Sequence, residues 1–482
     1  MSQDPTSGSN EPLDPTRRRV LTGIAATAAG AAGLAGRPSL ASPRPLDLPN
    51  PADSGIDHIV VVMMENRSFD HMMGWVPGAD GMQQGLSYTD TTGNTLSTFP
   101  MQGSLYGYQG CGFADPDHSY QAGHNDYNGG KMDGFLLPQP AGDLFPIGYY
   151  NRDDVLFYSG CADNWTICDH YHTGILSCTF PNRVYMHSGQ TDRLSNTLTI
   201  SKLPTIWDSL IANKVSSKYY FADTPITALW GAKYLVTHPI THQLEQFVYD
   251  FSPLGKAPSV SYIDPYFGLL IGEALGTSWD DHAFADIRDG QCFLNFIYNV
   301  LRHSPAWERT LLVINYDEWG GFFDHVAPPL APVSEAEAKL GNDGRLGIRT
   351  PCVIIGPRAR RAHVESTQFD PQSILNLIGW RFGFTPPGVR AATSTNLAAA
   401  LDFTSPLNTT APTIDVSYSG KTGPFPVKPP FLLPPPGGGN VFGGLCRKNS
   451  AAEQAEIDRR MEAHQSELKA LRTMAKQSGY SF

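Results

Sequence analysis

Charged side chains are scarce in this chain of 482 residues: they make up 17% of it, whereas hydrophobic residues make up 41%. Disordered and fibrous proteins do not have this balance, which predicts a large globular protein. A basic excess is also missing, because 35 Lys and Arg face 46 Asp and Glu, for a formal net charge of −11. Since a nucleic-acid-binding surface usually needs such an excess, we expect no nucleic-acid partner.

Cysteine is rare as well, and seven in this length exclude a small disulfide scaffold. Cys161, Cys168 and Cys178 are nevertheless close enough in sequence for one disulfide to form. The sequence has no P-loop, no G-x-G-x-x-G motif after a strand, no internal repeat and no apolar run long enough to span a membrane. Glycine (47) and proline (39) are abundant, which favours many long loops.

The N-terminal 41 residues have the pattern of an export signal. Residues 16–21 (TRRRVL) precede an Ala- and Gly-rich apolar run at 22–36, and Ser39-Leu40-Ala41 has the form of a cleavage site. The paired arginines resemble a twin-arginine signal. We therefore expect a product that is secreted, periplasmic or associated with the cell envelope. A polar tail followed by an Ala-rich helix is the alternative.

Short apolar runs alternate with helical patterns along the rest of the chain, which favours an α/β fold around a mostly parallel sheet. The expected buried parallel strands are 58–64, 218–222, 311–316 and 352–356, and the expected helices are 204–214, 291–303 and 371–382. Between about 76 and 160 no period is present, so we expect loops or a lid over a site.

We expect one main domain, residues 50–403, followed by a C-terminal part, residues 404–482. The first half of that part is rich in Pro and Gly, which predicts an extended segment. Residues 451–476 have strong helical propensity. The apolar residues that fall near one face of this helix, as in a docking helix, are Ile457, Met461, Leu468 and Leu471.

Two of the expected strands run directly into acidic residues, Glu65 after 58–64 and Asp317-Glu318 after 311–316. Ligands of open α/β sheets bind just beyond the carboxyl ends of strands, so these carboxylates would share one crevice. Their mutual repulsion amounts to several kcal/mol unless a cation lies between them, and oxygen ligands suit a divalent ion. Ordinary strand-end acids that cap helices or face water are the alternative.

The second candidate catalytic motif is Thr179-x-Pro-x-Arg183, in which an arginine follows a hydroxyl residue by four positions. Pro181 would fix the turn, and Arg183 would hold an anionic group or stabilise the activated hydroxyl. Threonine is a weak nucleophile that metal coordination can activate. The alternative is a surface loop. Three Asp-His pairs, which end in His118, His282 and His325, could bind phosphoryl oxygens or transfer protons.

Taken together these motifs resemble a known family. In chain order they are residues 65–70 (ENRSFD), 128–135 (NGGKMDGF), 179–183 (TFPNR), 281–282 (DH) and 316–325 (YDEWGGFFDH). This series, over roughly residues 55–385, is similar to the bacterial phosphoesterase family of non-specific phospholipases C and acid phosphatases, in the alkaline phosphatase superfamily.

The resemblance implies a mostly parallel central sheet with helices on both faces, as in alkaline phosphatase, with loop-rich insertions over the site. It implies that one divalent ion (Ca, Mn, Mg or Zn) is bound and that Thr179 is both ligand and nucleophile, assisted by Arg183. The other residues that would hold the metal are Glu65, Asn66, Asp317 and Glu318. Those that would contact the phosphoryl group or the leaving oxygen are His118, His282 and His325.

The chain departs from the family pattern at two positions: Ser177-Cys178 stands where Gly-Pro is common, and Ala283 follows His282 where Pro is common. We also expect no C-terminal β-domain pair like that of the larger phospholipases, since only about 100 residues follow the core. A sulfatase is disfavoured, because Thr179 carries a methyl group and cannot become formylglycine.

The expected function is that of an exported phosphoric ester hydrolase of phospholipase C type, acting on phospholipids such as phosphatidylcholine through a phospho-threonine intermediate. A broad acid phosphatase acting on phosphomonoesters is the alternative, and an exported binding protein without activity is a further one. Peripheral contact with a membrane would need an apolar rim. The segments that could supply it are Tyr106–Tyr108, Phe145–Tyr150 and Phe425–Pro436.

Overall fold

The structure is a computed structural model that describes residues 47–104, 106–108, 113–268, 278–283, 285–418 and 451–481. The predicted export signal, residues 1–41, lies outside the described residues, as does most of the Pro- and Gly-rich segment that follows residue 404. None of the described helices is both long enough and apolar enough to cross a membrane.

An eight-stranded sheet forms the centre of the described chain, in the order β12-β6-β11-β10-β1-β9-β7-β8. Seven of these strands point the same way, so the predicted mostly parallel sheet is confirmed. The strands are β1 His58–Met64, β6 Thr166–Cys168, β7 Ser217–Phe221, β8 Thr241–Gln243, β9 Val260–Asp264, β10 Thr310–Tyr316, β11 Val353–Ile355 and β12 His363–Glu365.

Strand β11 is the exception, because it runs antiparallel to both β10 and β6. The prediction of a parallel strand at 352–356 was therefore wrong in direction. Between β10 and β11 the only helix is the short α8, Glu335–Leu340. Without a crossover that returns to the other edge, the chain re-enters the sheet from the edge at which β10 ended.

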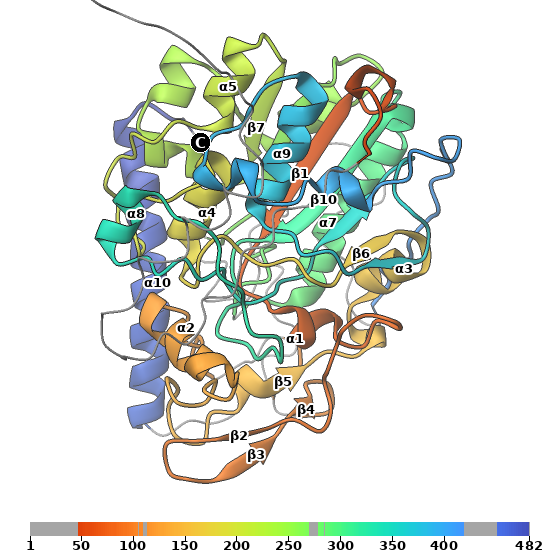
Figure 1. Cartoon of the computed structure of the whole chain (residues 1–482). Coiled ribbons are helices and arrows are strands. Elements are labelled where there is room, and N and C mark those ends of the chain that lie inside the picture. The colour runs from red at the N-terminus through yellow and green to blue at the C-terminus, as the bar shows by residue number, and fades with distance from the viewer. Residues whose placement is uncertain are drawn as a thin grey trace, which may run out of the picture. The chain divides into compact units, whose positions relative to one another are not determined.

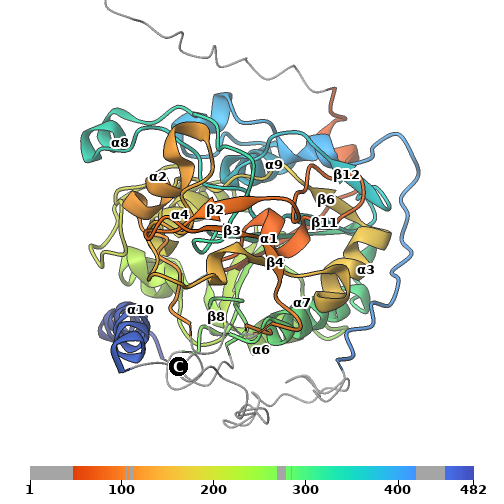
Figure 2. The ribbon, with the colours of Figure 1, turned by 90° about the horizontal axis from the view of Figure 1, so that it is seen from below.

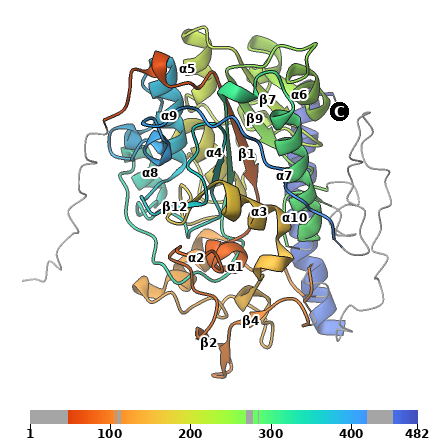
Figure 3. The same ribbon diagram turned by 90° about the vertical axis from the view of Figure 1, so that its right-hand side faces the viewer.

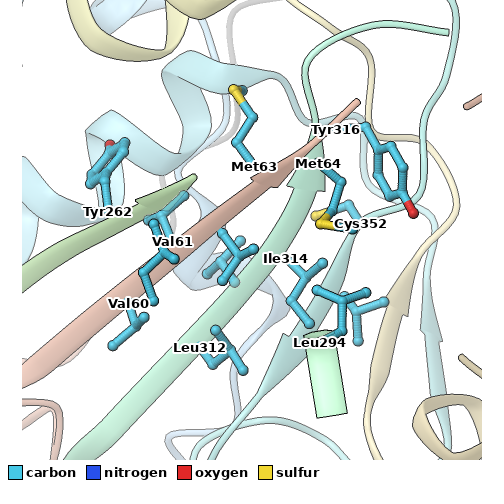
Figure 4. Close-up of a cluster of buried hydrophobic side chains, with 14 of the residues drawn as sticks. Val60, Val61, Met63, Met64, Tyr262, Leu294, Leu312, Ile314, Tyr316 and Cys352 are labelled. Carbon is cyan, nitrogen blue, oxygen red and sulfur yellow. The ribbon is translucent and has the colours of Figure 1, made fainter. Parts of the chain in front are cut away.

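The two central strands owe their place to continuous apolar runs. β1 and β10 pair in register from His58 with Thr310 to Met64 with Tyr316, and every residue of β10 is buried. A strand covered on both faces needs apolar side chains on both faces, which is why neither run alternates. Figure 4 shows this core, in which Val60, Val61, Leu312 and Ile314 pack around the two strands.

Helices cover both faces of the sheet. Figure 2 shows α4 and α9 on one side of it and α3 and α7 on the other. The predicted helices 204–214, 291–303 and 371–382 correspond to α5, α7 and α9. The helices not yet given bounds are α1 Phe69–Met73, α2 Tyr120–Tyr127, α3 Leu156–Asn164, α4 Thr179–Ser188, α5 Ile206–Ala212, α6 Leu244–Asp250, α7 Ile287–Arg302, α9 Pro371–Phe382 and α10 Ala451–Gln477.

The segment between β1 and β6 lies beyond the lower ends of the central strands in Figure 1 and consists of loops with short elements. Its strands are β2 Ser87–Thr89, β3 Thr95–Ser97, β4 Phe99–Pro100 and β5 Gly148–Tyr149. The predicted apolar rim is not exposed there: Phe145, Ile147 and Tyr150 are fully buried, so they belong to the core. Of the other two rim segments, 425–436 lies outside the described residues, and Tyr106 is buried.

The cysteines do not form the disulfide that the sequence permitted. Cys161, Cys168 and Cys178 are all buried and free, and burial raises the pKa of the Cys161 thiol well above its ordinary value. The three thiols therefore behave as small apolar side chains.

Candidate active site

Three neighbouring parallel strands bring buried carboxylates to one edge of the sheet. Glu65 follows β1, Asp317 follows β10, and Asp264 is the last residue of β9, the strand on the other side of β1. The backbone N–H of Asp317 donates to the carbonyl of Met64 at 3.1 Å, so pairing continues past the end of the two strands. Sequence-distant acids are thus held together because their strands are adjacent.

Arg183 joins the three strand ends. Its Nε donates to Asp317 Oδ2 at 3.0 Å, Nη1 to Asp264 Oδ1 at 2.9 Å and Nη2 to Glu65 Oε1 at 3.0 Å. The guanidinium is buried, and all three of its nitrogens bind carboxylates. Three of its N–H groups thus position the strand ends, and the predicted role of Arg183 toward an anionic group or the activated hydroxyl stays a prediction.

The predicted metal ligands each retain an oxygen that the protein does not use. Glu65 and Asp317 give one oxygen to Arg183, and Glu318 Oε2 accepts from the Gly320 N–H at 2.7 Å. The remaining oxygens are buried and have no hydrogen-bond partner among the described residues: Glu65 Oε2, Asn66 Oδ1, Thr179 Oγ1, Asp317 Oδ1 and Glu318 Oε1. Orphaned oxygens of this kind are costly, and their chemistry as oxygen ligands suits a hard divalent cation.

The pKa shifts of the strand-end carboxylates also favour a bound cation. Burial, to which the neighbouring Asp317 carboxylate adds, raises the pKa of Glu318 to about 8. Burial also raises the pKa of Asp317 to about 6, although Arg183 opposes the shift. The charged forms of these groups are thus disfavoured until a further positive charge joins Arg183.

Thr179 is the first residue of α4, where it is buried and not part of a surface loop. The side chain of Asn182 fixes the turn before it, since Oδ1 accepts from the Ile175 N–H at 3.0 Å and Nδ2 donates to the Ser177 carbonyl at 2.7 Å. The positive end of the helix dipole lies at this hydroxyl, where it favours negative charge. Arg183 follows one turn later on the same side of α4.

Two of the predicted histidines, His118 and His282, lie close together, with ring centroids 6.0 Å apart in an edge contact. The Nδ1 atoms of His118 and His282 lie 2.8 Å and 3.0 Å from the carbonyls of Pro116 and Ala283, which leaves each Nε2 for other contacts. Asn66 Nδ2 lies 3.4 Å from His118 Nε2, and Glu318 Oε1 lies 3.9 Å from the same atom. His282 Nε2 is buried without a hydrogen-bond partner in the described part of the chain.

The pKa values of these two imidazoles are shifted in opposite directions. Burial would lower the pKa of His118, but the carboxylates of Glu318 and Asp115 raise it to about 9. Burial lowers the pKa of His282 well below its ordinary value, and the neighbouring His464 and His118 add to the effect. A pair whose pKa values are driven apart suits one proton donor and one acceptor.

His325 belongs to a different cluster. Its Nδ1 lies 2.5 Å from Asp70 Oδ2 and its Nε2 lies 3.2 Å from Asp80 Oδ1, so carboxylates occupy both nitrogens. Arg349 ion-pairs with Asp70 and with Asp324 in the same cluster. The His325 ring is partly exposed and takes part in this ion-pair network, and its predicted contact with a phosphoryl group stays a prediction.

Groups of acidic and imidazole side chains whose ligand atoms lie within 4.8 Å of one another occur in three places in the described chain. They are Glu65 with His282 and His464, Asp115 with His118 and His282, and Asp70 with Asp324 and His325. The carboxylates of Glu65, Asp317 and Glu318 are not among these compact groups of described residues.

Comparisons with known proteins agree with these motifs. A sequence model of the phosphoesterase family matches residues 56–385. Phospholipase C A of Mycobacterium tuberculosis is 30% identical over 439 residues, which cover 77% of this chain and 82% of the relative. Non-specific phospholipase C1 of Arabidopsis thaliana is 31% identical over 335 residues, which cover 64% of this chain and 62% of the relative.

The chain belongs to the phosphoesterase family. It is a phosphoric ester hydrolase, with the α/β architecture described above. Among solved structures, the lipoteichoic acid synthase LtaP from Listeria monocytogenes aligns with a TM-score of 0.37 at 10% identity, over 74% of this chain and 80% of that one.

The structure of this phosphoesterase also shows site residues that sequence reasoning missed. Asp264 ends β9, a strand that was not predicted, and His464 lies on α10, far from any motif. Gly320 is a position where the glycine in the sequence has a structural reason. Its φ is +66°, and an added Cβ would lie 2.2 Å from the backbone oxygen of Asn66. The glycines of the YDEWGG motif thus allow the two strand-end loops to touch.

We predict that Glu318→Gln weakens metal binding without unfolding the phosphoesterase. Divalent metal added to chelator-treated wild type is expected to raise its Tm by several degrees, because a ligand that binds only the folded state stabilises it by about RT ln(1 + [M]/Kd). The variant should lose most of that rise, as measured by thermal unfolding with and without Mn²⁺ or Ca²⁺.

Glu337→Gln is the matched control, since Glu337 is another buried carboxylate that caps α8 and takes no part in the strand-end cluster. It should keep the wild-type response to metal. An undiminished metal-induced rise in the Glu318→Gln variant would exclude Glu318 as a ligand.

Proposed function

We propose that this phosphoesterase is an enzyme of phospholipase C type, which cleaves phospholipids such as phosphatidylcholine on the glycerol side through a phospho-threonine at Thr179. Its relatives include phospholipases C from Mycobacterium tuberculosis and Arabidopsis thaliana, which supports this proposal. The observation that carries the proposal is that Arg183, one turn after Thr179 in α4, ion-pairs with the acids at the ends of β1 and β10.

One divalent ion would be held by Glu65, Asn66, Thr179, Asp317 and Glu318, and the oxygen-only donor set suits Ca, Mn, Mg or Zn to different degrees. When bound, such an ion supplies positive charge that offsets the carboxylates and lowers the pKa of a coordinated hydroxyl.

The protein's own groups would then divide the reaction into two displacements at phosphorus. In the first, the Thr179 oxygen bonds to phosphorus, the bond to the glycerol oxygen breaks, and diacylglycerol leaves after that oxygen gains a proton. In the second, a water oxygen bonds to phosphorus and the bond to Thr179 breaks, which releases the phosphorylated headgroup. In this proposal His118 donates a proton and His282 accepts one.

Hydrolysis of phosphomonoesters is the competing function, because the same groups would serve it. One observation favours it: the aromatic segment Phe145–Tyr150, which could have formed a rim for lipid, is buried. A side-by-side assay on phosphatidylcholine and p-nitrophenyl phosphate separates the two. Diacylglycerol release without turnover of the monoester supports the phospholipase, and turnover of the monoester alone contradicts it.

We predict that Thr179→Ala lowers kcat by about 10³-fold or more on the preferred substrate, because no other hydroxyl replaces the nucleophile. The fold should survive, since the Thr179 hydroxyl makes no hydrogen bond to the described residues. Steady-state kinetics and the Tm measure the two effects.

Thr179→Ser is the matched control, as it keeps the hydroxyl and removes only a methyl group. It should retain far more activity than Thr179→Ala. Equal kcat values for wild type and Thr179→Ala would refute a nucleophilic threonine and would revive the idea of a binding protein.

We further propose that the chain is exported by the twin-arginine route, on the strength of the pattern in residues 16–41. Replacement of Arg17 and Arg18 by Lys should retain the enzyme in the cytoplasm of its host, as fractionation and immunoblotting would show. Release of the doubly substituted protein at the wild-type level would argue against that route.

A further inference from the structure

Helix α10 carries a stripe of inward-facing residues that changes character along its length. Towards its C-terminal end Leu468, Leu471 and Ala475 are buried, and the helix packs there against the 3₁₀ segment Ile226–Trp230. Towards its N-terminal end the same side of the helix carries Arg460, His464 and Glu467, which recur at the spacing of one helix face. Figures 1 and 3 show that α10 extends from beside the sheet to the level of α1 and α2.

Arg460 binds the loop that carries His118. Its Nη1 donates to the carbonyl of Asp115 at 2.9 Å and to Gln139 Oε1 at 3.1 Å, and its Nη2 donates to the carbonyl of Pro138 at 3.2 Å. Asp115 lies three residues before His118, so this contact fixes the backbone next to a site histidine.

Glu467 reaches the nucleophile helix through one intermediary. Asn196 Nδ2 donates to Glu467 Oε2 at 2.7 Å, and Asn196 Oδ1 accepts from the backbone N–H of Phe180 at 2.7 Å. Phe180 is the residue after Thr179. The C-terminal helix is therefore linked by two hydrogen bonds to the first turn of α4.

His464 packs directly on a site histidine. Its ring is stacked on that of His282, with centroids 3.8 Å apart and planes inclined by 21°. His464 is buried, and one ring nitrogen of each histidine lies within 4.8 Å of a Glu65 carboxylate oxygen. Another neighbour of the His282 ring is His118, whose centroid is 6.0 Å away at 79°. His282 is thus held between a stacked ring and an edge contact.

Stacking argues against a metal shared by the two rings. A metal bound by imidazole lies in the plane of that ring, along the nitrogen lone pair. The two ring centroids are 3.8 Å apart and the planes are inclined by only 21°, so the nearly parallel lone pairs do not converge within a metal–nitrogen bond of roughly 2 Å. The stacked His464 ring instead restricts the orientation of the His282 ring and so fixes the direction in which His282 Nε2 points.

We propose that α10 is part of the active site and that His464 is a positioning residue, which holds the ring of His282 by stacking. Arg460 and Glu467 act at the same time on the His118 loop and on the start of α4, so one helix face aligns three parts of the site. The inference rests on the candidate active site, but not on which phosphate ester is the natural substrate.

The test compares His464→Ala with His464→Phe. We expect kcat to fall by about 10- to 100-fold in the alanine variant, because small misplacements of a reacting group have effects of this size, with KM nearly unchanged. The phenylalanine variant keeps a flat ring on His282 and should recover most of kcat, although it has no ring nitrogen. Bound metal should equal that of wild type in both variants.

Kinetics are measured on whichever of p-nitrophenyl phosphate, bis-p-nitrophenyl phosphate or p-nitrophenylphosphorylcholine the wild type hydrolyses fastest. The variant-to-wild-type ratio then tests the role of His464 even if phosphatidylcholine is not a substrate. Lys469→Ala, on the exposed side of α10, is the control for general effects on the helix and should behave as wild type.

Three results would overturn the proposal. A wild-type kcat in His464→Ala would remove any role for the stack. Equal losses in the alanine and phenylalanine variants, each with an unchanged Tm, would show that the ring nitrogen itself is needed and that positioning is not the role. Loss of bound metal in both would make His464 a ligand.

Discussion

The ion pairs of Arg183 with three carboxylates are the constraint on which the rest of the site depends. Adjacent parallel strands place Glu65, Asp264 and Asp317 at one edge of the sheet, and burial there would be very costly without a partner charge. One guanidinium cannot neutralise the strand-end acids, since Glu318 lies beside them as well. The excess of negative charge is what makes this edge receptive to a cation, and it ties the nucleophile helix to the sheet.

A second consequence is that the two carboxylate oxygens of Glu65, and likewise those of Asp317, have different surroundings. In Glu65 and Asp317 one oxygen is fixed by Arg183, and the other is left without a protein partner. Arg183 therefore orients the two carboxylates and leaves one oxygen of each for a metal ion, as is expected of groups that surround a metal site. The cluster of Asp70, Asp324 and Arg349 differs, because Asp70 and Asp324 are both ion-paired to the arginine and also accept backbone N–H groups.

Much of this was predictable from local signals. The apolar runs of β1 and β10 and the acids that follow them gave both the strand pairing and the site edge. The direction of β11 was not predictable, because it depends on a connection that lacks a crossover helix. The carboxylates around Arg183 and His325 could not be predicted, since a residue type does not reveal how many acids surround it. His464 was missed because its place depends on tertiary docking of a helix separated from all motifs.

The most direct measurement is the anomalous X-ray difference map of crystals of the protein loaded with Mn²⁺. We expect one strong peak in contact with Thr179 Oγ1 and with the free oxygens of Glu65, Asn66, Asp317 and Glu318. A peak bound instead by Asp70, Asp324 and His325, or by His282 and His464 without Thr179, would contradict it.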